Sequence, residues 1–311
     1  MRELRGVSDI QPFSKENFQY AKGVAILLVL ISHIGNFSGK TWFTPLGGIG
    51  VAIFLFCSGY GVMTSYHRKG VAGYWKNKFI SIWIPFALVE TVSGIIHRYA
   101  LTDVAMELVF LKVLFANGWY MQYLAVCYLL FYVGVELLPN NISRFALWGI
   151  AAILSFVCCG NLQGEQALSF ISGLALAELH YRKEFNFKKS QIFAGGGTAL
   201  LVASVLFIIR QLPWTREQTA YLYTFLNIFF KGGFAAAIII VASVWKPAKR
   251  TVLWIDSISY SLYLVHGYFL FIVEKNLAGN FYASSAVMLG VSFVLAAILN
   301  EMVKNLKKRK E

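Results

Sequence analysis

Long apolar runs separated by short polar segments dominate this chain. A helix that spans a bilayer needs about twenty mainly apolar residues, and ten segments of the sequence approach that length. They cover Lys22–Ser38, Gly47–Tyr66, Phe79–His97, Trp119–Leu138, Arg144–Cys159, Glu165–Tyr181, Ile192–Arg210, Ala220–Trp245, Leu253–Glu274 and Tyr282–Val303. The pattern predicts an all-α, polytopic integral membrane bundle of about ten transmembrane helices.

One further apolar piece, Val104–Phe115, is too short to cross a bilayer. We expect it to lie at the membrane interface or to form a re-entrant half helix. No stretch between the apolar runs is long enough to fold separately in water. Residues 1–311 are therefore expected to form a single transmembrane domain.

The positive charges predict the orientation of the bundle, because cytoplasmic loops collect Lys and Arg. With the N-terminus inside, the inner segments of a ten-helix chain carry twenty Lys and Arg residues and the outer segments carry six. Miscounting one helix would largely erase this contrast. We therefore expect a multi-pass protein of the cytoplasmic (inner) membrane with both termini on the cytoplasmic side.

The composition supports the membrane class and argues against other classes. Hydrophobic residues make up 58% of the chain and charged residues 14%, against roughly a quarter charged in soluble domains. The net charge of +13 lies in short clusters between apolar segments, so no nucleic-acid binding is expected. The four cysteines have no paired spacing, and neither a metal site nor a disulfide framework is predicted.

Ionisable side chains at membrane depth are costly and often functional. His33 follows Lys22 by eleven residues, which places both near one face of the first helix, roughly 16 Å apart along its axis. Imidazole suits proton transfer near neutral pH, although a lone buried His is as often a packing residue. Glu90, Lys231 and His266 also lie near the middle of predicted helices. Glu90 and Lys231 are suited to pair with each other, either as a structural ion pair or as a substrate contact.

Two glycine clusters, Gly47–Gly50 and Gly195–Gly197, superficially suggest a phosphate-binding loop. Neither follows a predicted strand, which such a loop requires. Close packing between helices is the better interpretation.

Five short segments, spread over nearly the whole chain, form an ordered set of motifs. They are KGVAILLVLISH (Lys22–His33), GVAIFLFCSG (Gly50–Gly59), KNKFISIWIP (Lys76–Pro85), NGWYMQYLAVCY (Asn117–Tyr128) and SYSLYLVH (Ser259–His266). The set resembles the acyltransferase-3 family of membrane acyltransferases, which acylate sugars of bacterial surface polysaccharides and related hydroxyl compounds. Its order and its placement on ten expected helices make the resemblance specific.

The chain departs from the family pattern in three of these motifs. Lys22 stands where the family usually has Arg, and Ala52 replaces the usual Asp of the second motif. Lys78 and Ser81 occupy the positions of two arginines in the third. Lysine offers a point charge without the planar fork of Arg, so the phosphate contacts are expected to differ in detail.

The resemblance implies transfer of an acyl group, acetyl in the simplest case, from acyl-coenzyme A to a hydroxyl of a carbohydrate or lipid-linked sugar. No bound cofactor is implied. His33 would be the general base that takes the proton of the hydroxyl. Residues implied to contact the substrates are Lys22, Lys76 and Lys78 at the donor phosphates, and Ser58, Trp119 and Tyr120 along the tunnel. His266 belongs to a matching motif, but helix packing is the favoured role for it.

Two other classes of protein stay open. A transporter or flippase would use Lys231, Glu90 and His33 as a substrate or proton path, although two related halves, which many transporters have, are not visible. A non-catalytic membrane partner would retain the motifs as relics of the fold, and the departures at Ala52 and Ser81 are compatible with it. The acyl group, the acceptor and the oligomeric state are not specified by the sequence.

Overall fold

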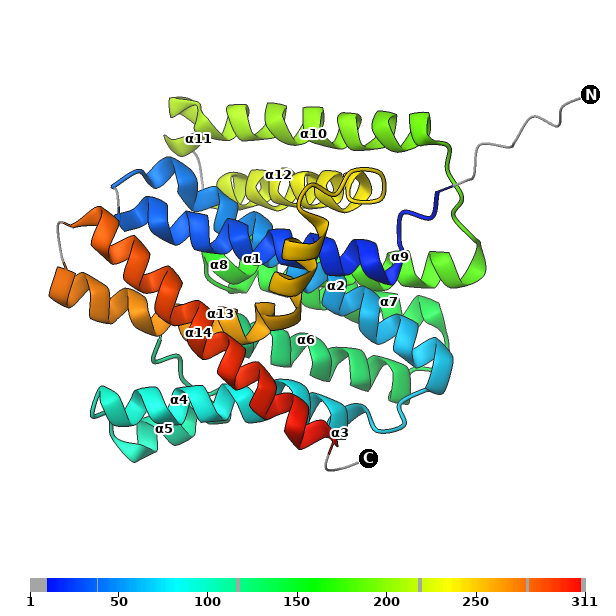
Figure 1. Ribbon diagram of the computed structural model, residues 1–311. Helices are drawn as coiled ribbons and strands as arrows, with labels where there is room; N and C mark the ends of the chain where they lie inside the picture. The colour runs from blue at the N-terminus through cyan, green and yellow to red at the C-terminus, as the bar shows by residue number, and fades with distance from the viewer. Residues whose placement is uncertain (1–9, 38, 116–117, 218–219, 278–279, 309–311) are drawn as a thin grey trace, which may run out of the picture. The chain divides into compact units, whose positions relative to one another are not determined.

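The computed structural model describes residues 10–37, 39–115, 118–217, 220–277 and 280–308. Within these ranges the chain is mainly helical, and its β-structure is a single isolated bridge between Ile10 and Phe187 (Figure 1). Ser38, the last residue of the first predicted helix, and Asn117, the first residue of the fourth motif, lie outside the described residues. The expected all-α class is confirmed for the described part of the chain.

The helical elements follow one another with short connections. They are α1 (Lys15–Phe37), η1 (Thr41–Phe43), α2 (Thr44–Lys69), α3 (Tyr74–Lys78), the π-helical η2 (Phe79–Trp83), α4 (Ile84–Ile96), α5 (Leu101–Leu108), α6 (Gly118–Leu137), α7 (Asn141–Cys158), α8 (Asn161–Gly164), α9 (Ser169–Arg182), α10 (Lys189–Gln211), α11 (Pro213–Glu217), α12 (Ala220–Val241), α13 (Lys249–Leu277) and α14 (Phe281–Lys308).

Side-chain caps mark where several of these helices begin. The Ser14 hydroxyl accepts a hydrogen bond from the backbone N–H of Asn17 (3.3 Å) at the start of α1. Asn140 caps α7 through the N–H of Ser143 (2.9 Å), and Asn280 caps α14 through the N–H of Ala283 (3.0 Å). Each cap satisfies one of the donors that the first helical turn leaves without a partner.

Eight helical segments in the described residues are long and apolar enough to cross a membrane. They are Lys15–Asn36, Thr41–Lys69, Tyr74–Ile96, Gly118–Leu137, Asn141–Cys158, Lys189–Gln211, Ala220–Val241 and Tyr282–Lys308. Each corresponds to one of the ten predicted spans. Large apolar side chains lie exposed along them, such as Ile95 (67%), Ile153 (63%) and Leu201 (65%), which suits residues that face lipid.

Two of the ten predicted spans are not among these eight. Within the span predicted over Glu165–Tyr181, residues 165–168 form turns between α8 and α9, and α9 is only 14 residues long. The span predicted over Leu253–Glu274 is helical within α13. Val104–Phe115 is confirmed as too short to cross, since α5 ends at Leu108. The side on which the termini lie stays a prediction.

Two compact units divide the chain. The first comprises residues 1–28, 48–68 and 151–253, and the second comprises residues 29–47, 69–150 and 254–311. Both units therefore draw on segments that are distant in sequence. That they form one transmembrane domain stays a prediction.

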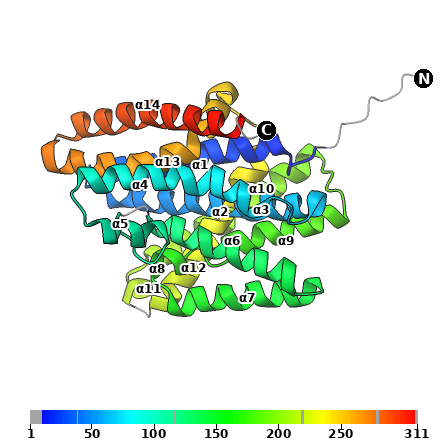
Figure 2. The same cartoon turned by 90° about the horizontal axis from the view of Figure 1, so that it is seen from below.

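Close backbone approaches hold the first unit together. A Cβ atom on Gly59 of α2 would lie 2.1 Å from the carbonyl oxygen of Phe170, and one on Gly173 of α9 would lie 2.1 Å from that of Phe56. The two helices therefore cross at a point where neither tolerates a side chain. In the same unit α10 runs along α12, as Figure 1 shows, and Figure 2 gives the view from below.

The second unit packs aromatic and small residues against each other. The indole Nε1 of Trp148 on α7 donates to the carbonyl oxygen of Leu130 on α6 (3.0 Å), and its ring covers Gly134, where a Cβ would lie 2.8 Å from Nε1. Between α4 and α5, a Cβ on Gly94 would lie 2.5 Å from a methyl group of Val104. These contacts fix the helices that carry the candidate site.

Candidate functional site

Two histidine rings meet in the second unit. His33 lies near the end of α1 and His266 lies on α13, and their ring centroids are 5.0 Å apart with the planes inclined by 50°. His266 is buried, with 1% of its surface exposed, while His33 is half-buried. The residue predicted as the catalytic base thus contacts the second histidine that the motifs singled out.

Hydrogen bonds fix the ring of His266. Its Nδ1 lies 2.7 Å from the carbonyl oxygen of Tyr263 and 3.1 Å from that of Leu262. A carbonyl oxygen only accepts, so Nδ1 carries the hydrogen and donates it. The Nε2 of a neutral His266 therefore retains its lone pair.

A row of aromatic rings continues from the histidines to α6. The centroids of His266 and Tyr263 are 5.4 Å apart, those of Tyr263 and Tyr120 are 4.8 Å apart, and those of Tyr120 and Trp119 are 6.2 Å apart. The structure thus brings together four of the residues selected from the sequence. Tyr263 was missed, although it stands three positions before His266 in the same motif.

A cavity of about 450 Å³ opens elsewhere in the second unit, with walls that include residues of α6. Its walls come from α3, η2, the stretch after α5, and α6, and they are mainly apolar: Phe79, Ile82, Trp83, Phe110, Met121 and Leu124. Lys76, Lys78, Trp75 and Tyr128 also line it. A concave, largely apolar cavity with a few polar groups is the usual form of a small-molecule site.

Two of the three lysines predicted to bind phosphate, Lys76 and Lys78, lie together at this cavity. The Lys78 ammonium nitrogen is 3.7 Å from the centroid of the Tyr128 ring and 5.6 Å from that of Tyr74. A cation over the face of an aromatic ring is attracted by the ring quadrupole. Lys76 is exposed. The structure therefore provides one lysine that is held in place and one that is free to reach solvent.

The cavity wall contains two unusual stretches of backbone. The π-helical turn η2 supplies Phe79, Ile82 and Trp83, and π-turns occur frequently at functional sites. Phe110 adopts a φ of +63°, which is unfavourable for a residue with a bulky side chain. Its carbonyl oxygen accepts a hydrogen bond from Gln122 Nε2 at 2.7 Å. Strained residues of this kind cluster at ligand sites.

Tyr260 connects α13, the helix that carries His266, to residues of the cavity wall. Its hydroxyl donates to the carbonyl oxygen of Ile82 (2.7 Å) and lies 3.7 Å from the sulfur of Met121. Ile82 and Met121 both line the cavity. Tyr260 precedes His266 by six residues on α13, which is a rise of about 9 Å along a helix.

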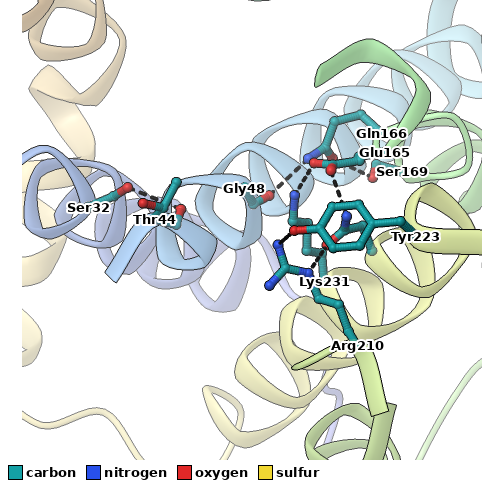
Figure 3. A network of polar contacts seen from close by, with 10 residues as sticks. Ser32, Thr44, Gly48, Glu165, Gln166, Ser169, Arg210, Tyr223 and Lys231 are labelled. Carbon is teal, nitrogen blue, oxygen red and sulfur yellow. Dashed lines mark hydrogen bonds and ion pairs between the residues drawn. The ribbon is translucent and has the colours of Figure 1, made fainter. Parts of the chain in front are cut away.

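Lys231 belongs to a buried polar network in the first unit, shown in Figure 3. Its ammonium group forms an ion pair with Glu165, which takes the place of the Glu90 partner that the sequence suggested. Asn227 donates to Glu165 (2.7 Å), and Arg210 donates from Nε to Asn227 (2.7 Å) and from its guanidinium to the hydroxyl of Tyr223. Glu165 was missed as a functional candidate because it stood at the end of a predicted span.

The glycines of the first cluster make room for polar side chains. A Cβ on Gly48 would lie 2.6 Å from the Lys231 nitrogen, and the Gly48 carbonyl oxygen accepts from Gln166 Nε2 at 3.0 Å. A Cβ on Gly47 would lie 2.9 Å from the Ser32 hydroxyl, which itself donates to the carbonyl oxygen of Thr44 (Figure 3). The packing interpretation of this cluster is confirmed at both positions.

Glu90 is almost fully buried in the second unit, with 1% of its surface exposed. Glu107 on α5 is also buried (2%), and its Oε1 accepts from the backbone N–H of Leu114 at 3.1 Å. Burial raises the pKa of the Glu107 carboxyl, more than its hydrogen bonds lower it. Glu107 was missed because it lies in a segment too short to span.

The remaining predicted residues lie in the first unit. Lys22 and Ser58 are half-buried on α1 and α2. As predicted, α1 is one unbroken helix through both Lys22 and His33. The structure gathers His33, His266, Tyr120 and the lysine-lined cavity in one unit.

The spanning helices define a multi-pass membrane protein, and the motifs on them define a membrane acyltransferase. The chain matches the family described as an acyltransferase domain over residues 15–301. It therefore belongs to the acyltransferase-3 family. No curated protein and no solved structure matches it.

Proposed function

We propose that this protein moves an acyl group, acetyl in the simplest case, from acyl-coenzyme A to a hydroxyl of a carbohydrate or lipid-linked sugar. His33 is the general base of this reaction. The observation that carries the proposal is the contact of His33 with His266, whose ring is held in one tautomer by Leu262 and Tyr263. The protein acts in the cytoplasmic membrane with its termini in the cytoplasm.

His33 takes the hydroxyl proton while the acceptor oxygen attacks the thioester carbonyl. A carbon–oxygen bond forms, the carbonyl becomes tetrahedral, and the carbon–sulfur bond then breaks. The imidazolium of His33 returns the proton to the departing sulfur, which leaves as the thiol of coenzyme A. We assign to the lone pair on His266 Nε2 the electrostatic stabilisation of this imidazolium.

The lysine-lined cavity supports a donor with phosphate groups. Lys76 and Lys78 supply positive charge at its wall, and Lys22 is assigned to the same role from its motif. Charge-assisted contacts to phosphate are among the stronger polar interactions. Trp119, Tyr120 and Ser58 are assigned to the walls along which the substrates lie.

The test compares His33→Ala with a matched variant, His97→Ala, at a half-buried histidine at the end of α4. Surface glycans from cells that express each variant are analysed by mass spectrometry, and membrane insertion is measured in the same cells. The purified proteins are then supplied with acetyl-coenzyme A and these glycans, and thiol release is followed. Loss of a general base is expected to slow transfer by about 10² to 10⁴.

His97→Ala is expected to retain acylation. Near-normal turnover by His33→Ala would exclude the proposed base. If glycans from cells without the gene lack the acyl group, yet the purified protein releases no thiol, the transporter class would be favoured instead.

A further inference from the structure

A second cavity, of about 500 Å³, lies in the first unit. Residues of α1, α10, α12 and the stretch after α12 line it, among them Phe193, Leu200, Ile238 and Trp245. Figure 1 shows α10 and α12 running alongside each other, the arrangement that forms this groove. Its lining side chains are apolar apart from the indole N–H of Trp245 and the hydroxyl of Tyr20, which donates to the carbonyl oxygen of Pro247 at 2.9 Å.

The second glycine cluster explains why the groove is open. Gly196 is needed for packing, since a Cβ there would lie 3.0 Å from Val241. A Cβ on Gly197 would meet no atom within 4 Å, yet Gly197 lines the groove. Glycine is less favourable than Ala inside a helix, and helix packing does not explain it at position 197. The helix packing predicted from the sequence thus explains the glycine at position 196 only. Nothing in the structure explains the glycine at position 195.

Exposed apolar side chains surround the groove. Phe193 is 51% exposed, Leu200 48% and Trp245 64%, so the rim of the groove is formed by large apolar side chains. From Phe193 to Leu200 the helix rises by about 10 Å. An apolar groove of this length in a membrane protein suits a hydrocarbon chain, which asks for no hydrogen bonds.

Positive charge accumulates at one end of the groove. The Lys189 nitrogen lies 5.8 Å from the Phe193 ring, one turn away along α10. Lys246 stands between two lining residues, Trp245 and Pro247. Glu16 forms ion pairs with both Lys246 (2.9 Å) and Lys249 (2.8 Å). The ammonium groups of Lys189, Lys246 and Lys249 outnumber the single carboxylate of Glu16. This end of the groove therefore carries a net positive charge.

We propose that this groove binds one hydrocarbon chain of an anionic phospholipid, whose phosphate group lies near Lys189 and Lys246. The apolar walls hold the chain, and the absence of a side chain at Gly197 gives it space. The lysines select the headgroup, because each basic residue near a membrane surface strengthens binding of anionic lipid by about fivefold. This site is separate from the residues assigned to acyl transfer and does not depend on that assignment.

The test uses the full chain in nanodiscs of phosphatidylcholine, with or without phosphatidylglycerol. Retained lipid is identified by native mass spectrometry, and the midpoint of thermal unfolding is measured. The wild type is expected to retain phosphatidylglycerol and to unfold at a higher temperature when that lipid is present. Gly197→Leu fills the groove and is expected to abolish both effects, whereas Gly195→Leu, which also meets no atom within 4 Å, is expected to preserve them.

A second pair of variants tests the charge without altering the groove. Lys189→Gln is expected to weaken retention of phosphatidylglycerol about fivefold, while Lys183→Gln, at an exposed lysine after α9, leaves it unchanged. This pair decides the question even if Gly197→Leu fails to fold. Equal retention of the two lipids, or equal behaviour of the two glycine variants, would overturn the proposal. A dimer that Gly197→Leu converts to a monomer would assign the groove to a second copy of the chain.

Discussion

The imidazole of His33 lies against that of His266, and the second ring is held by carbonyl groups of its own helix. A ring fixed through Nδ1 always presents the same nitrogen, Nε2, with its lone pair. Removal of that nitrogen and removal of the whole ring should therefore have different effects. This distinction separates a role in positioning His33 from a role in packing.

His266→Phe keeps an aromatic ring in the row but removes Nε2. We expect kcat to fall by about tenfold to a hundredfold with the donor KM unchanged, because the lost interaction is made mainly when His33 is charged. The acid limb of the pH dependence of kcat should also shift. Tyr263→Phe keeps its ring and its carbonyl group and should behave like the wild type. A His266→Phe variant with the wild-type kcat and pH profile would leave His266 a packing residue.

Lys78→Ala is expected to raise the donor KM about tenfold with little change in kcat, since a contact to a phosphate group remote from the reacting carbonyl is made equally in the ground and transition states. Steady-state kinetics with acyl-coenzyme A measure both constants. Lys112→Ala is the matched control, because Lys112 pairs with Asp103 at the surface of the same unit (2.6 Å). A donor KM that does not respond to Lys78→Ala would remove the phosphate role.

Lys231→Met is expected to destabilise the protein by about 3 to 5 kcal/mol, because it leaves the buried carboxylate of Glu165 without a cation to pair with. The double variant Lys231→Met with Glu165→Gln removes both charges and should recover most of that loss. Thermal unfolding of the single and double variants gives the coupling energy. If the double variant is stable but inactive, the pair contributes to function and is more than a structural contact.

Glu107 should make stability depend on pH in a sense opposite to most carboxyls. Burial raises its pKa in the folded protein above the unfolded value of about 4.3. Protonation therefore favours the folded state below the unfolded pKa, and this contribution is lost as the pH rises through the folded pKa.

Glu107→Gln mimics the protonated group and should stabilise the protein more at about pH 8 than at about pH 5. Unfolding midpoints at the two pH values measure this difference. Glu301→Gln, at an exposed residue paired with Lys304, should show no such gain. A pH-independent effect of Glu107→Gln would contradict the raised pKa.

Periodic apolar runs were sufficient to predict eight of the spanning helices, because each run matches the thickness of a bilayer. They did not predict the interruption of the helix at residues 165–168, for a physical reason. Glu165 and Gln166 are buried by partners on α12 and α2, and a hydropathy pattern contains no information about such partners. The helix that was expected there starts only at Ser169.

The candidate site was predicted in its residue types but not in its geometry. The motifs selected His33, His266, Tyr120 and Lys78, yet nothing in their spacing placed the two imidazoles in contact. That contact depends on how α1 and α13 pack, and the tautomer of His266 depends on carbonyl groups that every sequence has. The cavity beside Phe110 was not predicted, since a positive φ at a phenylalanine leaves no signal in the sequence.

The π-helical turn over Phe79–Trp83 adds one residue to the winding of the helix that carries Glu90. Each residue of a helix turns it by about 100°, so this insertion sets the rotational phase of α4 as a whole. Shortening the turn by one residue would restore regular winding and swing Glu90 from the interior toward the periphery. The π-helical turn thus determines which side chains of α4, Glu90 among them, point toward the interior of the protein.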